Sequence, residues 1–350
     1  MCRVPAGQTA HERGPVFATL ADMHRPRVTG IALVVVSAVA FGSGGLFARP
    51  AYAAGADWLT LMAWRFLIAA GLAWALLLAR PSSRRAFRAL PRKTLLMTAG
   101  LGVYYVSNTA TYFAGIAVVP LSLAALIVYM YPPVVAVLAQ RVGRPLEGRR
   151  AWVALGIALA GVLLAVGGID TSTAPPIGAL LLVVAAPLFY SGWIILAARL
   201  GGETSERVGH GSDEGATASV IGAVMLTSTG AVYWVWNLAT GHPVLPADVP
   251  AAAWPGILGV GVVAGFIAVQ AFYAGSQRIG AAQASLVSTV EPLWTIVAAG
   301  ILLGERLNPV QLAGGVLILG GVLLSQTGSG RGGADSGEAM PQPVVHLGED

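Results

Sequence analysis

Ten long apolar runs constrain this chain more than any other feature of its sequence. Each is 16–23 residues long, and together they hold two charged side chains, Arg65 and Glu291. A helix crosses the hydrocarbon core of a bilayer with about 20 apolar residues, whereas a membrane β-barrel would show short alternating strands. We therefore predict an all-α polytopic membrane protein with ten transmembrane helices. The runs are Thr29–Ala48, Leu59–Ala79, Leu95–Ala117, Leu121–Ala139, Trp152–Gly168, Ile177–Ala198, Ala216–Leu238, Trp254–Gly275, Ala281–Leu303 and Val310–Ser325.

The composition supports lipid rather than water as the main solvent. Charged residues make up 11% of the chain, against about 25% in a typical soluble domain. This excludes a disordered chain or a nucleic-acid-binding protein as the overall class. Cys2 is the single cysteine, so no intramolecular disulfide can form. We expect a small-molecule substrate and the bilayer as partners, with a homodimer left open, and we expect no catalytic residue, metal or cofactor.

The basic residues indicate the topology. Under the ten-helix prediction, 18 of the 21 lysines and arginines fall on one side, and such an excess marks cytoplasmic loops. Both termini are therefore predicted to be cytoplasmic, in a multi-pass protein of the inner (plasma) membrane. Residues 1–28 form the N-terminal segment, and the Gly-rich polar tail 328–350 is predicted to be disordered.

The two halves of the chain resemble each other. The run from Tyr112 to Gly115 matches the run from Phe272 to Gly275 at an offset of 160 residues, and the same offset pairs Pro132 with Pro292. Two units of five helices follow, over residues 29–168 and 177–326. A unit with an odd number of helices enters the membrane in the opposite direction the second time, so the sequence predicts an inverted repeat, as in many secondary transporters.

These features resemble the drug/metabolite transporter superfamily, in its two-domain EamA-type branch. The resemblance covers roughly residues 29–326 and depends on Arg65, on the two mid-helix prolines and on the run Gly304–Leu307 with Gln311 after it. It implies an inner-membrane exporter of amino acids or related metabolites. It also implies a structural or gating role for Arg65.

Three prolines predict helix breaks. Pro132 and Pro292 cannot donate to the carbonyls four residues earlier, and Pro187 stands mid-helix in the sixth run. A free carbonyl in lipid is costly unless it faces protein or a water-filled cavity. Paired breaks in the two halves therefore indicate a substrate site near the midplane. The alternative is that the prolines only kink the helices for packing.

The two membrane charges are candidates for function. Glu291 lies near the midplane, where it could bind a cationic group or relay a proton, and the alternative is a structural cap at Pro292. Arg65 could attract a carboxylate or phosphate, or extend its side chain toward the interface. The two side chains lean in opposite directions along the membrane normal, which disfavours a direct pair.

Polar and aromatic side chains complete the predicted site. Asn108 and Gln270 are the amides most costly to bury, and both stand on polar stripes at helical spacing. Aromatic residues flank the predicted breaks and could form walls for an organic solute: Tyr129, Tyr190, Trp193 and Trp294. Helix-to-helix packing is the alternative role for the smaller polar residues on the same faces.

The predicted function is a secondary transporter that moves a small organic metabolite by alternating access. Gly259-x-Gly261-x-x-Ala264 formally fits a dinucleotide motif, but it lies inside an apolar run with no preceding strand. With no P-loop elsewhere, ATP-driven transport is not indicated. The alternatives are a channel-like pore and, less favoured, a membrane-embedded lipid enzyme, which would need more than one carboxylate near its site.

Overall fold

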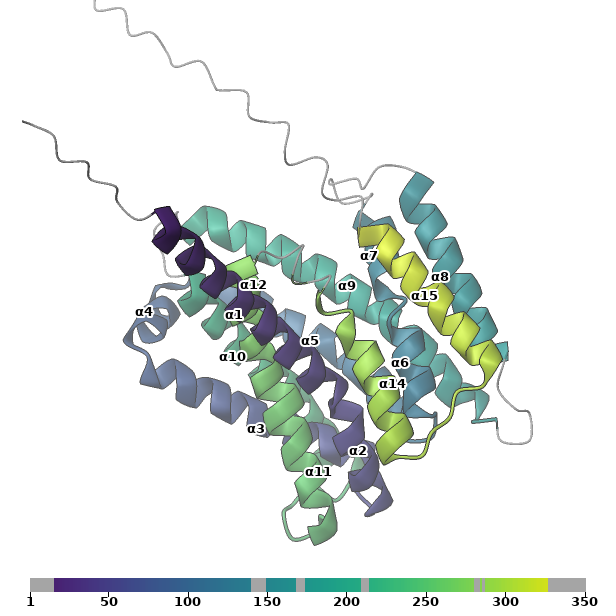
Figure 1. The fold of residues 1–350 in the computed structure, drawn as a ribbon. Helices are drawn as coiled ribbons and strands as arrows, with labels where there is room; N and C mark the ends of the chain where they lie inside the picture. Colours follow the sequence, from purple (N-terminus) through teal and green to yellow (C-terminus); the bar gives the residue numbers. More distant parts are fainter. Residues whose placement is uncertain are drawn as a thin grey trace, which may run out of the picture.

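The computed structural model is all-helical across the residues that it describes, which are 16–139, 149–167, 174–208, 214–279, 284 and 287–326 (Figure 1). The predicted all-α polytopic fold is confirmed. The predicted tail 328–350 and the first 15 residues of the N-terminal segment lie outside the described residues. The helices are α1 Val16–Gly42, α2 Gly44–Ala53, α3 Trp58–Ala79, α4 Pro81–Ala89, α5 Arg92–Gly115, α6 Leu121–Val128, α7 Tyr131–Ala139, α8 Arg149–Gly167, α9 Ile177–Val208, α10 Glu214–Thr240, α11 Trp254–Leu258, the π-helix η2 Gly259–Ile267, α12 Ala268–Ile279, α14 Val290–Leu302 and α15 Pro309–Gln326.

Length and hydropathy separate these helices into two groups. In the described part of the chain, five helical stretches are long and apolar enough to cross a membrane, and four apolar stretches are shorter. The helix α5 is long enough to cross a membrane, but Tyr104, Asn108 and Thr111 along its length lower its hydropathy. A helix with such a polar stripe is stable in a membrane when the stripe faces other protein groups or a cavity.

Most of the membrane helices pack side by side in a closed ring. Around the ring, α1 contacts α12, η2 contacts α3, α3 contacts α10, α10 contacts α5, α5 contacts α9, α9 contacts α7, α6 contacts α14, and α14 contacts α1. The pair α8 and α15 stands outside this ring, against α6 and α7 (Figure 1). The ring therefore encloses the faces on which polar side chains can be sheltered from lipid.

Where α8 crosses α15, a glycine of each helix packs closely against a backbone carbonyl of the other. A Cβ atom added to Gly161 would lie 2.6 Å from the carbonyl oxygen of Gly314, and one added to Gly321 would lie 2.6 Å from that of Ala154. A shift of 160 residues, forward for one partner and backward for the other, exchanges these two contacts. This is the relation that a two-fold axis between repeats produces.

A second pair of crossings repeats one of its two partners at this offset. A Cβ atom on Gly275 of α12 would lie 2.8 Å from the carbonyl oxygen of Gly30 in α1, and one on Gly115 of α5 would lie 3.4 Å from that of Ala179 in α9. Gly275 and Gly115 differ by the repeat offset of 160, whereas Gly30 and Ala179 differ by 149. A glycine at the same repeat position thus allows close approach in both crossings, against partners at different repeat positions.

The close approach of α8 and α15 predicts a strong effect of a side chain at the crossing. We expect Gly314→Val to lower the free energy of unfolding by about 1–3 kcal/mol or more, because its Cβ would lie 2.5 Å from the oxygen of Gly161 and 2.7 Å from the nitrogen of Ala165. Gly320→Val on the same helix is the matched control, since nothing lies within 4 Å of its Cβ. Melting in detergent measures both; equal melting temperatures would contradict this packing.

Two membrane helices are interrupted at matching places. Turns at Tyr129–Met130 separate α6 from α7, and turns at Ser288–Thr289 precede α14. Each interruption lies just before a proline, Pro132 or Pro292.

The predicted break at Pro187 is wrong, because α9 continues through this residue without interruption. One proline removes one hydrogen bond and adds one local clash, and α9 is held along its length against α5 and α7. A break that the sequence did not predict occurs at Ser43, between α1 and α2, where no proline stands. The hydroxyl of Ser43 donates to the carbonyl of Val39 at 2.7 Å.

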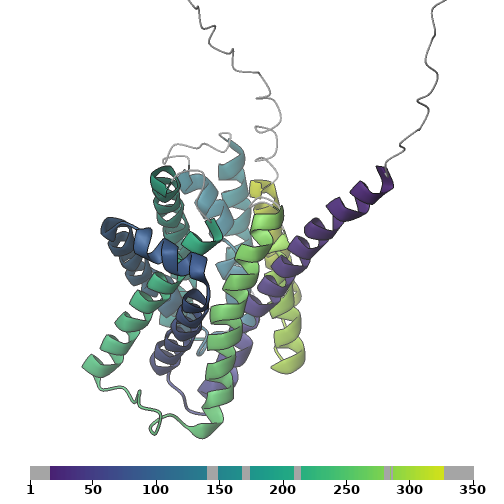
Figure 2. The ribbon, with the colours of Figure 1, turned by 90° about the vertical axis from the view of Figure 1, so that its left-hand side faces the viewer.

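The two ends of the bundle differ in what they carry. The start of α1, the short helix α4 and the end of α15 lie at one end, and the segment 241–250 lies at the other (Figure 2). We call these the α4 end and the opposite end. The start of the first membrane helix and the end of the last one therefore lie on the same side, as an even number of crossings requires.

Candidate functional site

The two helix breaks meet inside the ring. The hydroxyl of Tyr129, at the break between α6 and α7, donates to the carbonyl oxygen of Ser288 at 2.7 Å. This is the carbonyl that Pro292 leaves without its usual helical donor. The same hydroxyl lies 3.2 Å from Oε2 of Glu291, in the first turn of α14. One side chain thus satisfies the broken helix of the other half and contacts the membrane carboxyl group.

This arrangement depends on where the proton of Glu291 is. A tyrosine hydroxyl has one hydrogen, and here the shorter contact assigns it to Ser288. A protonated Glu291 can then donate to the Tyr129 oxygen, whereas an ionised Glu291 would face that oxygen's lone pairs. Loss of the proton would favour rotation of the hydroxyl toward Glu291 and away from Ser288. A proton on Glu291 is therefore coupled to the contact between the two breaks.

A continuous row of rings leads away from this contact. We call it the aromatic arc, and its members in order are Tyr129, Tyr131, Tyr190, Trp193, Tyr105 and Phe66. Neighbouring ring centroids are 4.7–6.2 Å apart, within the range of stacked and edge-to-face contacts. The rings come from α3, α5, α7, α9 and the first break, so the arc joins both halves of the chain.

The arc unites three of the predicted aromatic residues and adds others. Tyr129, Tyr190 and Trp193 lie in it, as the sequence suggested. Tyr105 and Tyr131 were not identified from the sequence. Tyr131 stands 160 residues before Glu291, so the repeat itself was the signal that could have found it.

The two membrane charges do not form an ion pair in the described structure. The guanidinium carbon of Arg65 lies 4.6 Å from the ring centroid of Phe113 and 5.2 Å from that of Phe66. Phe66 is one end of the aromatic arc, and Tyr129 at the other end contacts Glu291. The cation and the carboxyl group therefore neighbour opposite ends of the arc.

The predicted amides lie in different surroundings. Asn108 is half-buried on α5, three residues after Tyr105 and four before Tyr112, so the three share one face of the helix. Gln270 lies in the wall of a cavity of about 750 Å³ that reaches Arg80 at the α4 end. Ala73 is also in this wall, and Arg65 is eight residues, or about 12 Å, further along α3.

Trp294 lies apart from the aromatic arc. Its indole nitrogen donates to the hydroxyl of Ser43 at 2.9 Å, at the break between α1 and α2. The next residue, Thr295, donates to the carbonyl of Gly42 at 3.1 Å. In this structure Trp294 therefore joins α14 to the first membrane helix and does not line the wall with Tyr190 and Trp193.

A carboxylate joins α6 to the segment after α14 at the opposite end. Glu305, in the segment after α14, accepts hydrogen bonds from the backbone nitrogens of Leu121 and Ser122, at 2.9 and 2.8 Å, and from the Ser122 hydroxyl. It caps the N-terminus of α6, where a negative charge is favourable. Arg49 of α2 lies 3.7 Å from it and also donates to the carbonyl of Ile116. The sequence showed Glu305 only as part of a family motif.

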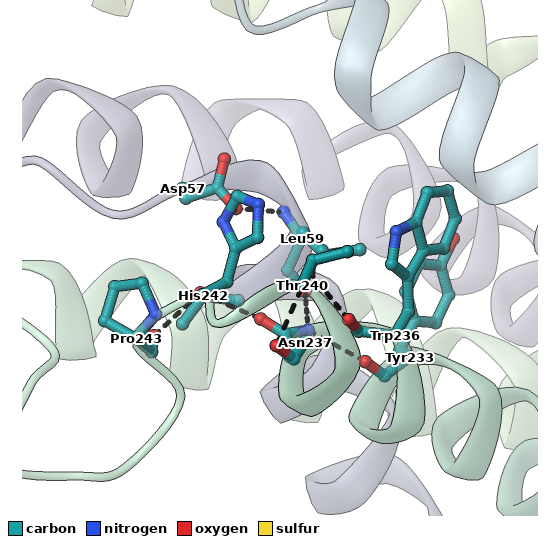
Figure 3. A network of polar contacts seen from close by, with 9 residues as sticks. Asp57, Leu59, Tyr233, Trp236, Asn237, Thr240, His242 and Pro243 are labelled. Carbon is teal, nitrogen blue, oxygen red and sulfur yellow. Dashed lines mark hydrogen bonds and ion pairs between the residues drawn. The ribbon is translucent and has the colours of Figure 1, made fainter.

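A second polar network at the same end joins α3 to α10 (Figure 3). Asp57 lies 3.1 Å from Nδ1 of His242, and the amide of Asn237 donates to the carbonyl of Leu59 at 3.1 Å. Thr60 donates to the carbonyl of Pro243 at 2.9 Å. The ring is thus hollowed at the α4 end and tied together by side chains at the opposite end.

A polytopic helical ring with facing helix breaks, and with a cavity toward one end, is typical of a membrane transporter. Comparison with known families agrees: the EamA-like transporter family matches residues 28–167 and again 177–327, so the chain belongs to this family. The resemblance seen in the sequence is confirmed. The glycines of the dinucleotide-like motif lie in η2, where Gly261 packs on Ile68.

Two known proteins are similar along most of their length. The chain is 25% identical to "Uncharacterized transporter YcbK" from Bacillus subtilis, over 87% of this chain and 93% of that protein. It also resembles a solved structure described as "Crystal structure of protein", with a TM-score of 0.57 and 17% identity, over 85% of this chain and 98% of that one. The first supports a membrane transporter, and the second supports the fold.

Proposed function

We propose that this chain is a secondary transporter that carries a small organic metabolite, an amino acid or a related compound, out of the cell across the inner membrane by alternating access. The observation that carries the proposal is the contact of Tyr129 with both Ser288 and Glu291, where two interrupted helices meet inside the ring. A carrier needs a site at depth that can change its access, and interrupted helices from two repeats supply such sites.

The mechanism follows from this contact. With the α4 end hollowed and the opposite end tied by Glu305, solute enters from the α4 end and reaches the aromatic arc. Exchange of the proton on Glu291 changes the Tyr129 contact between the two breaks. The two repeats then move relative to each other, so that the Glu305 cap opens and the cavity closes. Asn108, on the α5 face beside the arc, contacts the polar part of the solute.

The proposed orientation places the α4 end and both termini in the cytoplasm. The basic residues support it, because Arg80, Arg84, Arg85, Arg88 and Arg92 lie in or next to α4. Residues 29–168 and 177–326 are the two repeats of this proposal, and they are inverted relative to each other. In the proposed orientation, the hollowed end faces the cytoplasm. This is the inward-open state, in which an exporter can bind its solute from the cytoplasm.

Cysteine labelling tests the orientation. In a Cys2→Ser background, we expect Asp248→Cys to react with an impermeant maleimide added to intact cells, because Asp248 is exposed at the opposite end. Arg84→Cys, exposed at the α4 end, is the matched control and should react only after the cells are opened. The reverse pattern would overturn the orientation and, with it, the direction of export.

Transient counterflow in proteoliposomes tests the transport function. Vesicles loaded with a metabolite mixture are diluted into trace labelled solutes, and a carrier should accumulate its own labelled solute transiently above equilibrium. Equilibration without an overshoot would indicate a channel instead. No movement of any solute, together with chemical conversion of added lipid, would indicate an enzyme.

A further inference from the structure

The guanidinium of Arg65 is buried without an anion. The residue is 7% exposed, and its Nε and Nη1 atoms have no hydrogen-bond partner in the described structure. Its contacts are the rings of Phe113 and Phe66. Contact with a ring face offsets only a small part of the cost of burying a charge in a membrane protein. The site therefore lacks an acceptor that would complete it.

Trp193 contributes a second buried donor without a partner. Four buried side-chain atoms in the described residues have no hydrogen-bond partner, and three of them are Nε and Nη1 of Arg65 and Nε1 of Trp193. Other tryptophans of the described chain do use this donor: Trp64 donates to Val244, Trp74 to Thr227 and Trp234 to Ala63. The free indole nitrogen of Trp193 thus differs from the pattern in the rest of the fold.

Both sets of unused donors lie near Tyr105. Tyr105 is 5.0 Å from Trp193 between ring centroids, and 6.2 Å from Phe66, which contacts the guanidinium of Arg65. The donors carry hydrogens and a single positive charge, and the surfaces between them are aromatic. They match a ligand group that has only acceptors and one negative charge, attached to an apolar body.

We propose that Arg65 and Trp193 bind the carboxylate of a monocarboxylic organic acid, whose apolar body lies along the aromatic arc at Tyr105. A carboxylate matches the single charge of one arginine, whereas a phosphate dianion would leave one charge uncompensated at this depth. Glu291, at the far end of the arc, disfavours a second carboxylate. The inference rests on the proposed transport function and names the part of the substrate that this end of the site recognises.

The first test needs no ligand. Because an unpaired buried charge is destabilising, Arg65→Met should melt at or above the temperature of the wild-type protein in detergent. A role in holding the fold predicts the reverse: Arg65→Met would melt several degrees lower, and Arg65→Lys would restore part of the loss. That second result would overturn the proposal.

The second test uses benzoate, phenylacetate and indole-3-acetate as probes, each beside its neutral amide. At least one acid should stabilise the purified full-length protein against melting, and its amide should not. Arg65→Met should abolish this stabilisation, and Trp193→Phe, which removes only the indole donor, should weaken binding about tenfold. Trp64→Phe is the matched control and should leave the affinity unchanged, since its donor is already bonded to Val244.

The outcomes separate this inference from the transport function. Stabilisation by the amides as strong as by the acids, or by none of the acids, would overturn the carboxylate site. If counterflow still shows an overshoot in that case, the transport function stands and the inference fails. If counterflow also fails, both fall.

Discussion

Glu291→Gln should remove the pH dependence of transport while the protein stays folded. The wild-type rate should change by up to about tenfold per pH unit, because one proton is exchanged in each cycle. The glutamine amide can donate to the oxygen of Tyr129 as a protonated Glu291 would, so Tyr129 can keep its bond to Ser288. The variant resembles the protonated carrier at every pH, and its rate should be flat.

The measurement is solute uptake against pH, with melting in detergent as the control for folding. Tyr129→Phe is the companion variant: it removes the side-chain donor to the Ser288 carbonyl, which keeps the backbone nitrogen of Glu291 at 3.0 Å, and should cost about 0.5–1.5 kcal/mol of stability. A structural role for Glu291 gives a different pair of results. Glu291→Gln would then keep the wild-type pH profile, and Glu291→Ala would melt at a lower temperature.

Glu305→Ala should destabilise the closed opposite end. It removes three hydrogen bonds to a charged acceptor, from the two backbone nitrogens and from the hydroxyl of Ser122. Bonds to a charged group contribute about 1.5–3 kcal/mol each, and water replaces part of them at a helix terminus. We expect a net loss of about 2–4 kcal/mol and a lower melting temperature, because α6 loses its cap.

Two further variants test whether the loss of stability comes from the Glu305 carboxylate. Glu305→Gln keeps one acceptor oxygen and should lose less stability than Glu305→Ala. Arg306→Ala, at an exposed neighbouring position, is the matched control and should melt like the wild-type protein. Equal melting of Glu305→Ala and Arg306→Ala would show that the cap does not hold the opposite end closed.

Much of the fold could be predicted from the sequence because hydropathy and repetition determine it. The apolar runs fixed the class, and the offset of 160 between Pro132 and Pro292 anticipated two facing breaks. Pro187 misled the prediction, because a proline interrupts a helix only where the neighbouring structure does not hold it straight. The break at Ser43 has no proline signal, since it depends on contacts from the distant helix α14, where Trp294 donates to the Ser43 hydroxyl and Thr295 donates to the carbonyl of Gly42.

The candidate site was only partly visible in the sequence. Helical spacing groups residues within one helix, so it indicated Asn108 on α5, but it cannot place α5 beside α9. The contact of Tyr105 with Trp193, and the separation of Trp294 from the other aromatic residues, depend on that packing. Glu305 was similarly hidden, because its partners lie more than 180 residues earlier in the chain.

In the proposed mechanism, solute binds where the two helix breaks meet the aromatic arc. A density map of the protein with a solute that shows counterflow would locate this binding site. We expect the solute against Tyr190 and Trp193, within reach of Arg65 at one end of the arc and of Glu291 at the other. Solute density confined to the cavity wall at Gln270, or lying between α8 and α15, would contradict the claim.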